Sequence, residues 1–174
     1  MISFDKIKLL VLDCDGVLSD GQIIYDSNGV ESKNFSVKDG LGIKLLSFTD
    51  IKVAVVTGRK SDILVQRCQD LGITILRQKI RNKEKVVGEI LHELDLSWDN
   101  LAYMGDDWND YPVMQKAQLS ACPVDSTDEF KKKMDFVSTY SGGKGAVRNY
   151  INFILKNKGI YEKTIEDFLA YLRV

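Results

Sequence analysis

The sequence has a single histidine among its 174 residues, and this scarcity narrows the choice of active site. His92 lies in the stretch LHELD, which has the pattern of an amphipathic helix, so we predict that it is an exposed helical residue. Histidine-based catalytic triads and metal centres built from several histidines are therefore excluded.

Cysteine is also scarce, since Cys14, Cys68 and Cys122 are the three in the chain. Their odd number and wide spacing suggest neither a disulfide framework nor a CxxC metal site. No arginine stands six residues after any of them, as it would in a phosphate loop built on a cysteine nucleophile. We therefore predict that all three are small hydrophobic residues of the core.

The chain also has almost no net charge and contains no long apolar run. A formal charge of −1 provides no electrostatic basis for binding nucleic acid or an anionic membrane. No apolar run approaches the roughly 20 residues that span a bilayer, and the opening ISFDKIK does not follow the order of a secretory signal. We expect a cytoplasmic protein, with neither a membrane nor a nucleic acid as partner, that forms one domain over residues 1–174.

Short apolar runs alternate along the chain with helical patterns. Runs typical of buried strands lie at 7–13, 52–57, 73–76, 101–106 and 119–123, with a shorter one at 136–139. Helical patterns lie at about 40–49, 61–72, 83–94, 110–117 and 127–134. This alternation predicts an α/β fold, a doubly wound and mostly parallel sheet with helices on both faces. Ligands of such sheets bind beyond the carboxyl ends of the strands.

Two segments depart from the alternation. Residues 22–35 carry Asn28-Gly29, a signal for a two-residue hairpin turn, between two strand-like arms. We predict a small β-hairpin flap here, standing over the end of the first strand. Residues 145–174 form the tail, which is predicted to contain two helices after the glycine-rich stretch SGGKG.

Polar and charged residues follow four of the predicted strands. They are Asp13 and Asp15 in DCDG, Thr57 in TGRKS, Lys83 and Lys85 in RNKEK, and Asp106, Asp107 and Asp110 in GDDWND. In a parallel sheet these four strand ends meet at one edge. The alternation of a strand also places Asp13 and Asp15 on one side and Cys14 on the other, toward the core.

Clustered carboxylates repel one another unless a cation lies among them, and a ligand set made of oxygen alone favours Mg²⁺. Thr57 and Lys83 are suited to holding a phosphoryl group. One aspartate could attack phosphorus while its neighbour two residues on transfers the proton. Taken singly, each stretch could also be a solvated turn, a helix start or an acidic loop that binds calcium, so the prediction depends on their combination.

These four stretches resemble the motifs of the haloacid dehalogenase-like hydrolases, in the branch with a minimal cap. DCDGVLSDG resembles the first motif, VVTGRKS the second, Lys83 the third and GDDWND the fourth. FSVKDGLGIKLL and SGGKGAVRNYI are further similar to the 3-deoxy-D-manno-octulosonate 8-phosphate phosphatases within that family. The resemblance implies a Mg²⁺-dependent phosphatase of this sugar acid, acting in lipopolysaccharide biosynthesis as a homotetramer.

The resemblance also implies roles for single residues. Asp13 would be the nucleophile and a metal ligand, Asp15 the general acid/base and a ligand through its carbonyl, and Asp106 a further ligand. Thr57 and Lys83 would hold the phosphoryl group, with Asp110 orienting Lys83. The residues expected to contact the sugar-acid phosphate are Asp15, Ser36, Val37, Lys38, Asp39, Gly40, Lys44, Arg59, Arg67 and Lys83.

Some alternatives stay open at this point. Lys44 stands where the family has arginine, and the family's glycine before Lys83 is missing, which leaves Lys85 as the alternative phosphate-binding lysine. A nine-carbon sialic-type 9-phosphate is the other substrate, although that branch tends to have glutamate where this chain has Arg59. A phospho-receiver and a catalytically silent module are more distant readings. Asp15 argues against the receiver, and the intact set of acidic and basic residues argues against the silent module.

Overall fold

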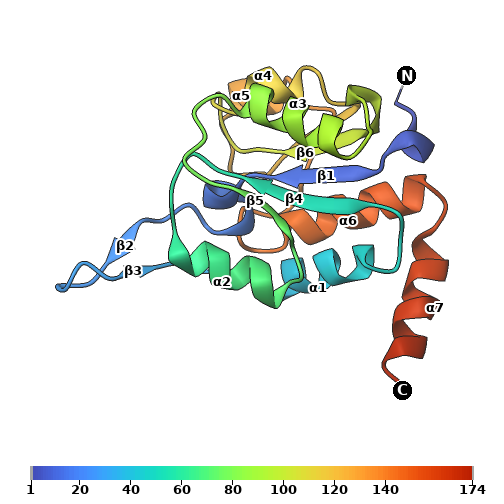
Figure 1. Ribbon diagram of the computed structural model, residues 1–174, viewed down its shortest axis with the longest axis horizontal. Helices are drawn as coiled ribbons and strands as arrows, with labels where there is room; N and C mark the ends of the chain where they lie inside the picture. Colours follow the sequence, from blue (N-terminus) through green and yellow to red (C-terminus); the bar gives the residue numbers. More distant parts are fainter. Residues whose placement is uncertain (1, 174) are drawn as a thin grey trace.

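Residues 2–173, which the computed structural model describes, contain a six-stranded sheet in which all strands are parallel. Across the sheet the order is β5-β4-β1-β6-β7-β8, and Figure 1 labels β5, β4, β1 and β6 of these strands. The strands are β1 (Leu9–Leu12), β4 (Lys52–Val56), β5 (Ile75–Arg77), β6 (Leu101–Met104), β7 (Leu119–Cys122) and β8 (Phe136–Val137). The chain leaves β1 toward β4 and β5 and then returns to β6 on the other side. The strand order therefore changes direction at β1, where ligands of such sheets bind.

Helices cover both faces of the sheet, as the alternation predicted (Figure 1). One face carries α1 (Val37–Leu46), α2 (Asp62–Asp70) and α6 (Ala146–Asn157), and the other carries α3 (Lys83–Glu93), α4 (Tyr111–Met114) and α5 (Asp128–Lys131). The last helix, α7 (Tyr161–Tyr171), packs beside α1 and α6. None of the helices within residues 2–173 is long and apolar enough to cross a membrane.

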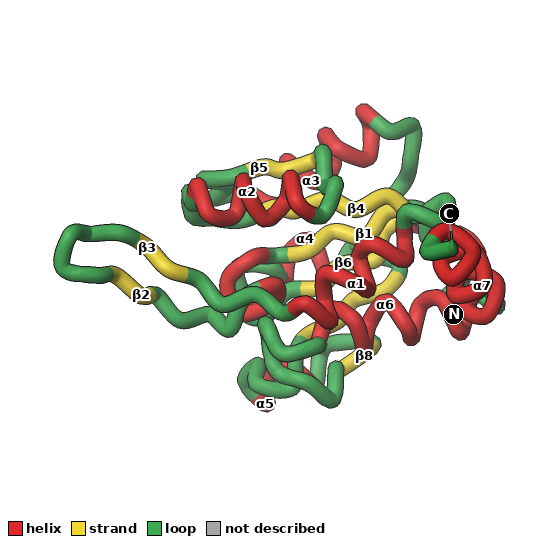
Figure 2. Tube along the Cα trace, turned by 90° about the horizontal axis from the view of Figure 1, so that it is seen from below, coloured by secondary structure: helices red, strands yellow, loops and turns green. Residues whose placement is uncertain are grey.

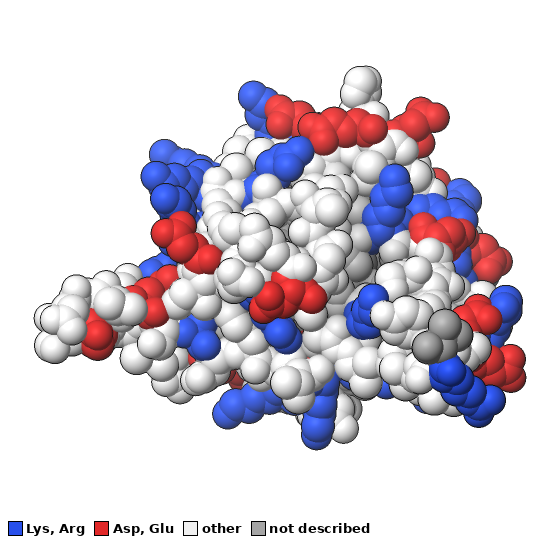
Figure 3. Space-filling model, turned by 60° about the horizontal axis from the view of Figure 1, so that its bottom comes forward, with Lys and Arg blue, Asp and Glu red and all other residues white. Residues whose placement is uncertain are grey.

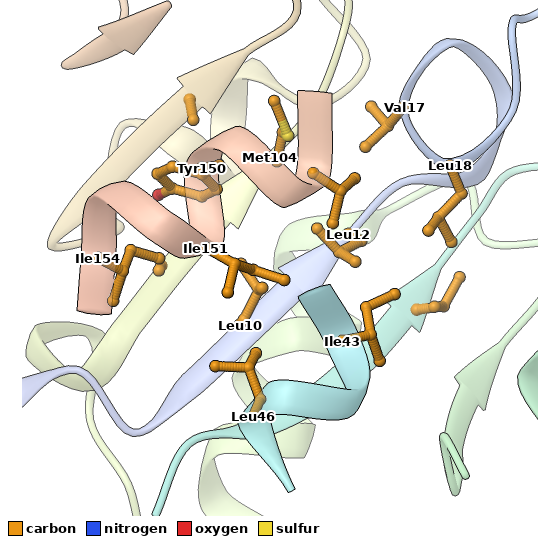
Figure 4. Packing of buried hydrophobic residues seen from close by; sticks show 14 of the residues in the cluster. Leu10, Leu12, Val17, Leu18, Ile43, Leu46, Met104, Tyr150, Ile151 and Ile154 are labelled. Atoms are coloured by element: carbon orange, nitrogen blue, oxygen red, sulfur yellow. The ribbon is translucent and has the colours of Figure 1, made fainter. Parts of the chain in front are cut away.

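The two faces of β1 are buried in two separate clusters. Leu10 and Leu12 pack with α1 and α6, whereas Leu9 and Val11 pack toward α3 and α4. Figure 4 shows that Val17 and Leu18, which lie beyond the end of β1, extend the first cluster. Since both are almost fully buried, the loop that follows β1 is anchored in the core by its own apolar side chains.

The predictions for the three cysteines and for the single histidine are confirmed. Cys14, Cys68 and Cys122 are free and buried, and His92 is exposed in the last turn of α3. Burial raises the pKa of the Cys14 thiol far above its ordinary value, so this cysteine remains protonated at neutral pH.

Three helices differ from the prediction by three residues at one end or both, and the other two differ by at most two. The first begins at Val37 instead of about residue 40, because the hydroxyl of Ser36 accepts hydrogen bonds from the amides of Lys38 and Asp39 and caps the helix there. The helices predicted at 110–117 and 127–134 are limited to α4 and α5. After α4 the carbonyl of Val113 accepts from the amides of Lys116 and Ala117, which closes a single turn, and after α5 the chain continues with bonds between residues three apart.

The flap consists of β2 (Ile24–Tyr25) and β3 (Glu31–Ser32), paired antiparallel. It projects from the end of the molecule opposite to α7 and the turn Phe4–Lys6 (Figure 2). The prediction of a two-residue turn was wrong, because the strands are joined by the longer loop 26–30, in which Gly29 alone has a positive φ. The carboxylate of Asp26 stabilises this loop by accepting hydrogen bonds from the amides of Asn28 and Val30.

The glycine-rich stretch before α6 packs tightly against the loop that follows β1. The amide of Gly143 donates to the carbonyl of Val17 at 2.9 Å. A Cβ atom on Gly142 would lie 1.9 Å from the carbonyl oxygen of Gly16, which is backbone and cannot move aside. This close contact therefore requires glycine at position 142. It also holds the loop that follows β1 in place.

We expect Gly142→Ala to destabilise the protein by about 1–3 kcal/mol, the usual cost of overpacking a well-packed site. The matched control is Gly88→Ala in α3, where the added Cβ would meet Trp98 at an ordinary 3.6 Å. That variant should be stabilised by up to about 1 kcal/mol, because alanine favours the helix more than glycine does. Urea denaturation of both variants measures the difference, and equal stabilities would contradict the proposed close packing.

Candidate active site

Four strand ends meet beside the reversal point of the sheet. Asp13 follows β1, Thr57 follows β4 and Asp106 follows β6, while Lys83 opens the helix after β5. A cavity of about 240 Å³ lies between them. It is lined by Asp13, Asp15, Thr57, Gly58, Arg59, Asp106, Asp107 and Asn109. Because Lys83 contacts Asp13, the structure brings together residues from all four predicted stretches.

A buried ammonium group lies at the floor of this site. The Nζ atom of Lys83 is 2.9 Å from Oδ2 of Asp13 and 2.7 Å from Oδ1 of Asp110. All three side chains are at most 6% exposed. Burial opposes the charge of Lys83, but the two carboxylates outweigh it and hold its pKa above the ordinary value. Lys85 is different, since its side chain is 74% exposed and its nearest charged partner is Glu89.

Negative charge exceeds positive charge in this cluster. Carboxylate oxygens of Asp13, Asp106 and Asp110 all lie within 4.8 Å of one another. Burial, followed by the charge of Asp110, raises the pKa of Asp13 to about 8 and that of Asp106 to about 7. Among the described residues, Oδ2 of Asp110 is buried without a hydrogen-bond partner. A set of clustered oxygen donors with unbalanced charge suits a divalent cation.

The turn Cys14–Leu18 brings the backbone close to Asp106. Gly16 has a φ of +81°, and a Cβ atom there would lie 2.1 Å from Oδ2 of Asp106. Only glycine combines this backbone conformation with such close approach. Asp13 accepts a hydrogen bond from the amide of Cys14 at 2.7 Å, which fixes its Oδ1 atom at the start of the turn.

Asp15 has different neighbours from Asp13, although it lies only two residues away. Its Oδ1 atom is 2.5 Å from the ammonium group of Lys33 in the flap, and its Oδ2 atom is 3.8 Å from Nε of Arg59. Cys14 points into the core, as predicted. The two acids therefore line one cavity but are held by separate cations.

The predicted substrate residues of α1 are arranged around the start of that helix. Arg67 donates to the carbonyl of Ser36 at 3.1 Å and lies close to Gly40. Asp39 is buried and accepts hydrogen bonds from the amides of Gly145 and Arg148 at the start of α6. Val37 and Lys38 are exposed.

The structure does not bring Lys44 to this cavity. This lysine lies in the last turn of α1, and its ammonium group is 5.3 Å from the ring centroid of Tyr171 in α7. Of the predicted substrate residues, Asp15 and Arg59 line the cavity itself, and Lys83 contacts Asp13 at its floor.

Comparison with known proteins places the chain in a family. Residues 60–151 match the family model of haloacid dehalogenase-like hydrolases. The chain is 43% identical over 159 residues to 3-deoxy-D-manno-octulosonate 8-phosphate phosphatase KdsC of Escherichia coli BL21-DE3, covering 91% of this chain and 85% of that protein. The chain belongs to the haloacid dehalogenase-like hydrolases.

Solved structures agree with this assignment. A 3-deoxy-D-manno-octulosonate 8-phosphate phosphatase from Yersinia pestis superposes with a TM-score of 0.89 at 40% identity, covering 91% of this hydrolase and 86% of that chain. The phosphatase from Moraxella catarrhalis, solved with magnesium, phosphate and the sugar acid KDO, gives a TM-score of 0.90 at 35% identity, with 95% of both chains covered.

Three residues of the hydrolase site were not predicted from the sequence. The hydroxyl of Tyr103 donates to Oδ1 of Asp110 at 2.5 Å, and a tyrosine in an otherwise apolar buried strand could have signalled a polar partner. Lys33 and Glu31 of the flap contact each other at 3.4 Å beside Asp15. Charged residues in a short hairpin are usually solvated, so the sequence carried no signal for their position.

We expect Lys83→Met to destabilise the hydrolase by about 3–5 kcal/mol, the typical effect of removing one partner from a buried ion pair. The carboxylates of Asp13 and Asp110 would then be buried without their cation. Lys85→Met is the matched control and should change stability by less than about 0.5 kcal/mol. Urea denaturation at neutral pH without added metal measures both, and a comparable loss in the two variants would contradict the assignment of Lys83.

Proposed function

We propose that this hydrolase is a Mg²⁺-dependent phosphatase that converts 3-deoxy-D-manno-octulosonate 8-phosphate into the free sugar acid and phosphate, in lipopolysaccharide biosynthesis. The similarity to phosphatases of that name over nine-tenths of the chain supports the substrate. The chemistry rests on one observation, that Asp13 and Asp15 line one cavity but have different cationic partners. A nucleophile and a proton donor need such separate surroundings.

Asp13 is the nucleophile of the proposed reaction. One of its oxygens attacks phosphorus, and the bond between phosphorus and the sugar oxygen breaks to leave an aspartyl-phosphate. Asp15 gives its proton to the departing sugar oxygen. Asp15 then accepts a proton from water as the water oxygen attacks phosphorus, and the release of phosphate regenerates the Asp13 carboxylate.

The carboxylates of Asp13 and Asp106, with the backbone carbonyl of Asp15, would hold Mg²⁺. When bound, Mg²⁺ neutralises charge on the phosphoryl oxygens. The unbalanced carboxylates described above fit this ion. Asp110 has a different role in this proposal: its Oδ1 atom accepts from Lys83 and Tyr103, while its Oδ2 atom, which has no partner among the described residues, adds to the negative charge that Mg²⁺ would balance. Asp110 thereby orients the ammonium group of Lys83.

Thr57 and Lys83 hold the phosphoryl group in this proposal. Thr57 is buried where β4 ends, and Lys83 supplies a fixed positive charge. Arg59 extends from the same loop to the cavity wall and Arg67 braces the start of α1, so their guanidinium groups are suited to the substrate's carboxylate. We assign the remaining sugar contacts to the stretch Ser36, Val37, Lys38, Asp39 and Gly40. Lys44 is left out of this set, because its ammonium group lies against Tyr171 in α7.

We also propose that the enzyme is a cytoplasmic homotetramer of single-domain chains. The flap supports association, because Ile23, Tyr25 and Val30 are each more than half exposed. Figure 3 shows the projecting tip of the flap as largely uncharged surface. Apolar side chains that gather on a projecting element are typical of contact surfaces.

The substrate proposal predicts Mg²⁺-dependent release of phosphate from 3-deoxy-D-manno-octulosonate 8-phosphate. A nine-carbon sialic-type 9-phosphate should react at least about tenfold more slowly, since one misplaced sugar contact costs on the order of 1.4 kcal/mol. Phosphate release from both esters, with Mg²⁺ and with chelator, measures this preference. Slow and equal turnover of both esters would reduce the proposal to a general sugar-phosphate phosphatase.

Substitution of the two acids should separate their roles. Asp13→Asn should lower kcat by more than about 10³-fold, because no nucleophile remains. Asp15→Asn should lower kcat by about 10²- to 10⁴-fold, the range for proton transfer, with little change in the Mg²⁺ concentration needed. Asp62→Asn, at an exposed position near the same loop, is the control. Near-normal turnover by Asp13→Asn would contradict its assignment as nucleophile.

A further inference from the structure

Lys33 is a buried lysine on an element that otherwise projects into solvent. It follows β3 of the flap, yet its side chain is only 1% exposed. Its ammonium group lies 2.5 Å from Oδ1 of Asp15 and 3.4 Å from Oε1 of Glu31. Lysines on hairpins normally extend their charge into water, and burying a charge is costly unless it is paired. The position of Lys33 therefore depends on Asp15.

The contacts around Lys33 form a closed network. Glu31 accepts from Nη2 of Arg59 at 3.1 Å and from the hydroxyl of Ser61 at 2.7 Å. The same Nη2 atom donates to the hydroxyl of Tyr25 at 2.9 Å. Since Arg59 also faces Oδ2 of Asp15, each oxygen of that acid has its own cation, and Glu31 links the two cations. The rotation of the Asp15 carboxyl group is thus limited by Lys33 of the flap and by Arg59, which Glu31 of the flap holds in place.

We propose that Lys33 is a positioning residue, which fixes the carboxyl group of Asp15 at the cavity wall and so couples proton transfer to the position of the flap. The inference rests on the function proposed above. While the bond from phosphorus to Asp13 forms and the bond to the sugar oxygen breaks, the proton of Asp15 passes to that oxygen. A carboxyl group that is free to rotate is seldom aligned for this transfer.

Two other roles for Lys33 make different predictions. If it only anchored the flap, or if it bound the phosphoryl group, its loss would affect all phosphate esters similarly. A positioning role affects esters according to their leaving group. A sugar alkoxide needs a proton to depart, whereas p-nitrophenolate is a stable anion that departs without one. A comparison of the two esters therefore isolates proton transfer.

The test measures kcat/KM of Lys33→Met for 3-deoxy-D-manno-octulosonate 8-phosphate and for p-nitrophenyl phosphate. This constant covers the steps up to release of the first product. We expect a fall of about 10²-fold for the sugar ester and of less than about threefold for the nitrophenyl ester. Lys33→Arg, which can also donate to Asp15, should restore most of the loss. Lys60→Met, at a 60% exposed lysine of the neighbouring loop, should leave both values unchanged.

A double variant completes the test. In an Asp15→Asn protein, Lys33→Met should not lower kcat/KM for the sugar ester further, because both changes remove the same proton transfer. Equal falls for the two esters, or additive effects in the double variant, would overturn the positioning role and leave the proposed function intact. If the unmodified protein hydrolysed neither ester in the presence of Mg²⁺, the proposed function and this inference would fail together. Thermal unfolding of each variant shows whether it is folded.

Discussion

The buried contact of Lys83 with Asp13 and Asp110 is the interaction on which the site depends. One ammonium group lies against two carboxylates, and Asp106 adds a third within reach. Burial, together with this imbalance, raises the pKa values of Asp13 and Asp106, and the excess negative charge favours a second cation. A dianionic phosphate ester is repelled by such a site until a cation compensates the negative charge of the carboxylates. The second cation and the buried ammonium group of Lys83 therefore serve the same purpose, which is to balance the charge of the carboxylates.

Rigid elements of the fold hold these charged groups in position. Asp13 lies at the end of the central strand β1, and the turn behind it is anchored by Val17 and Leu18 in the core. Because Gly16 has no Cβ atom, the turn after β1 can approach Asp106. Because Gly142 has none, the glycine-rich stretch can pack against the backbone of Gly16 and support the turn. A larger residue at Gly16 would collide with the carboxylate of Asp106, and one at Gly142 would collide with the backbone of Gly16.

Much of this arrangement could be predicted from the sequence, because strand ends of a parallel sheet converge whatever the details of packing. The gathering of Asp13, Thr57, Lys83 and Asp106 follows from that rule. The fold class follows from the alternation of strand and helix patterns, and the burial of Cys14 from the alternation of side chains along a strand. The short extent of α4 and α5 and the longer flap turn depend on local hydrogen bonds that a hydrophobic pattern does not encode. Only the structure shows which of Lys83 and Lys85 lies in the site. Two lysines in the first turn of one helix differ in the direction that they face, which the sequence pattern does not reveal.

The position of the flap residues could not be predicted for a different reason. Lys33 is 18 residues from Asp15 in sequence, and its burial results from the charges it meets and not from its own hydrophobicity. The site therefore has two halves with different origins. The central strand β1 and the start of α3 hold Asp13 and Lys83, whereas the flap and the loop after β4 hold Asp15. In the proposed mechanism, changes in the flap therefore alter proton transfer by Asp15, while the half that holds the phosphoryl group stays fixed by the core.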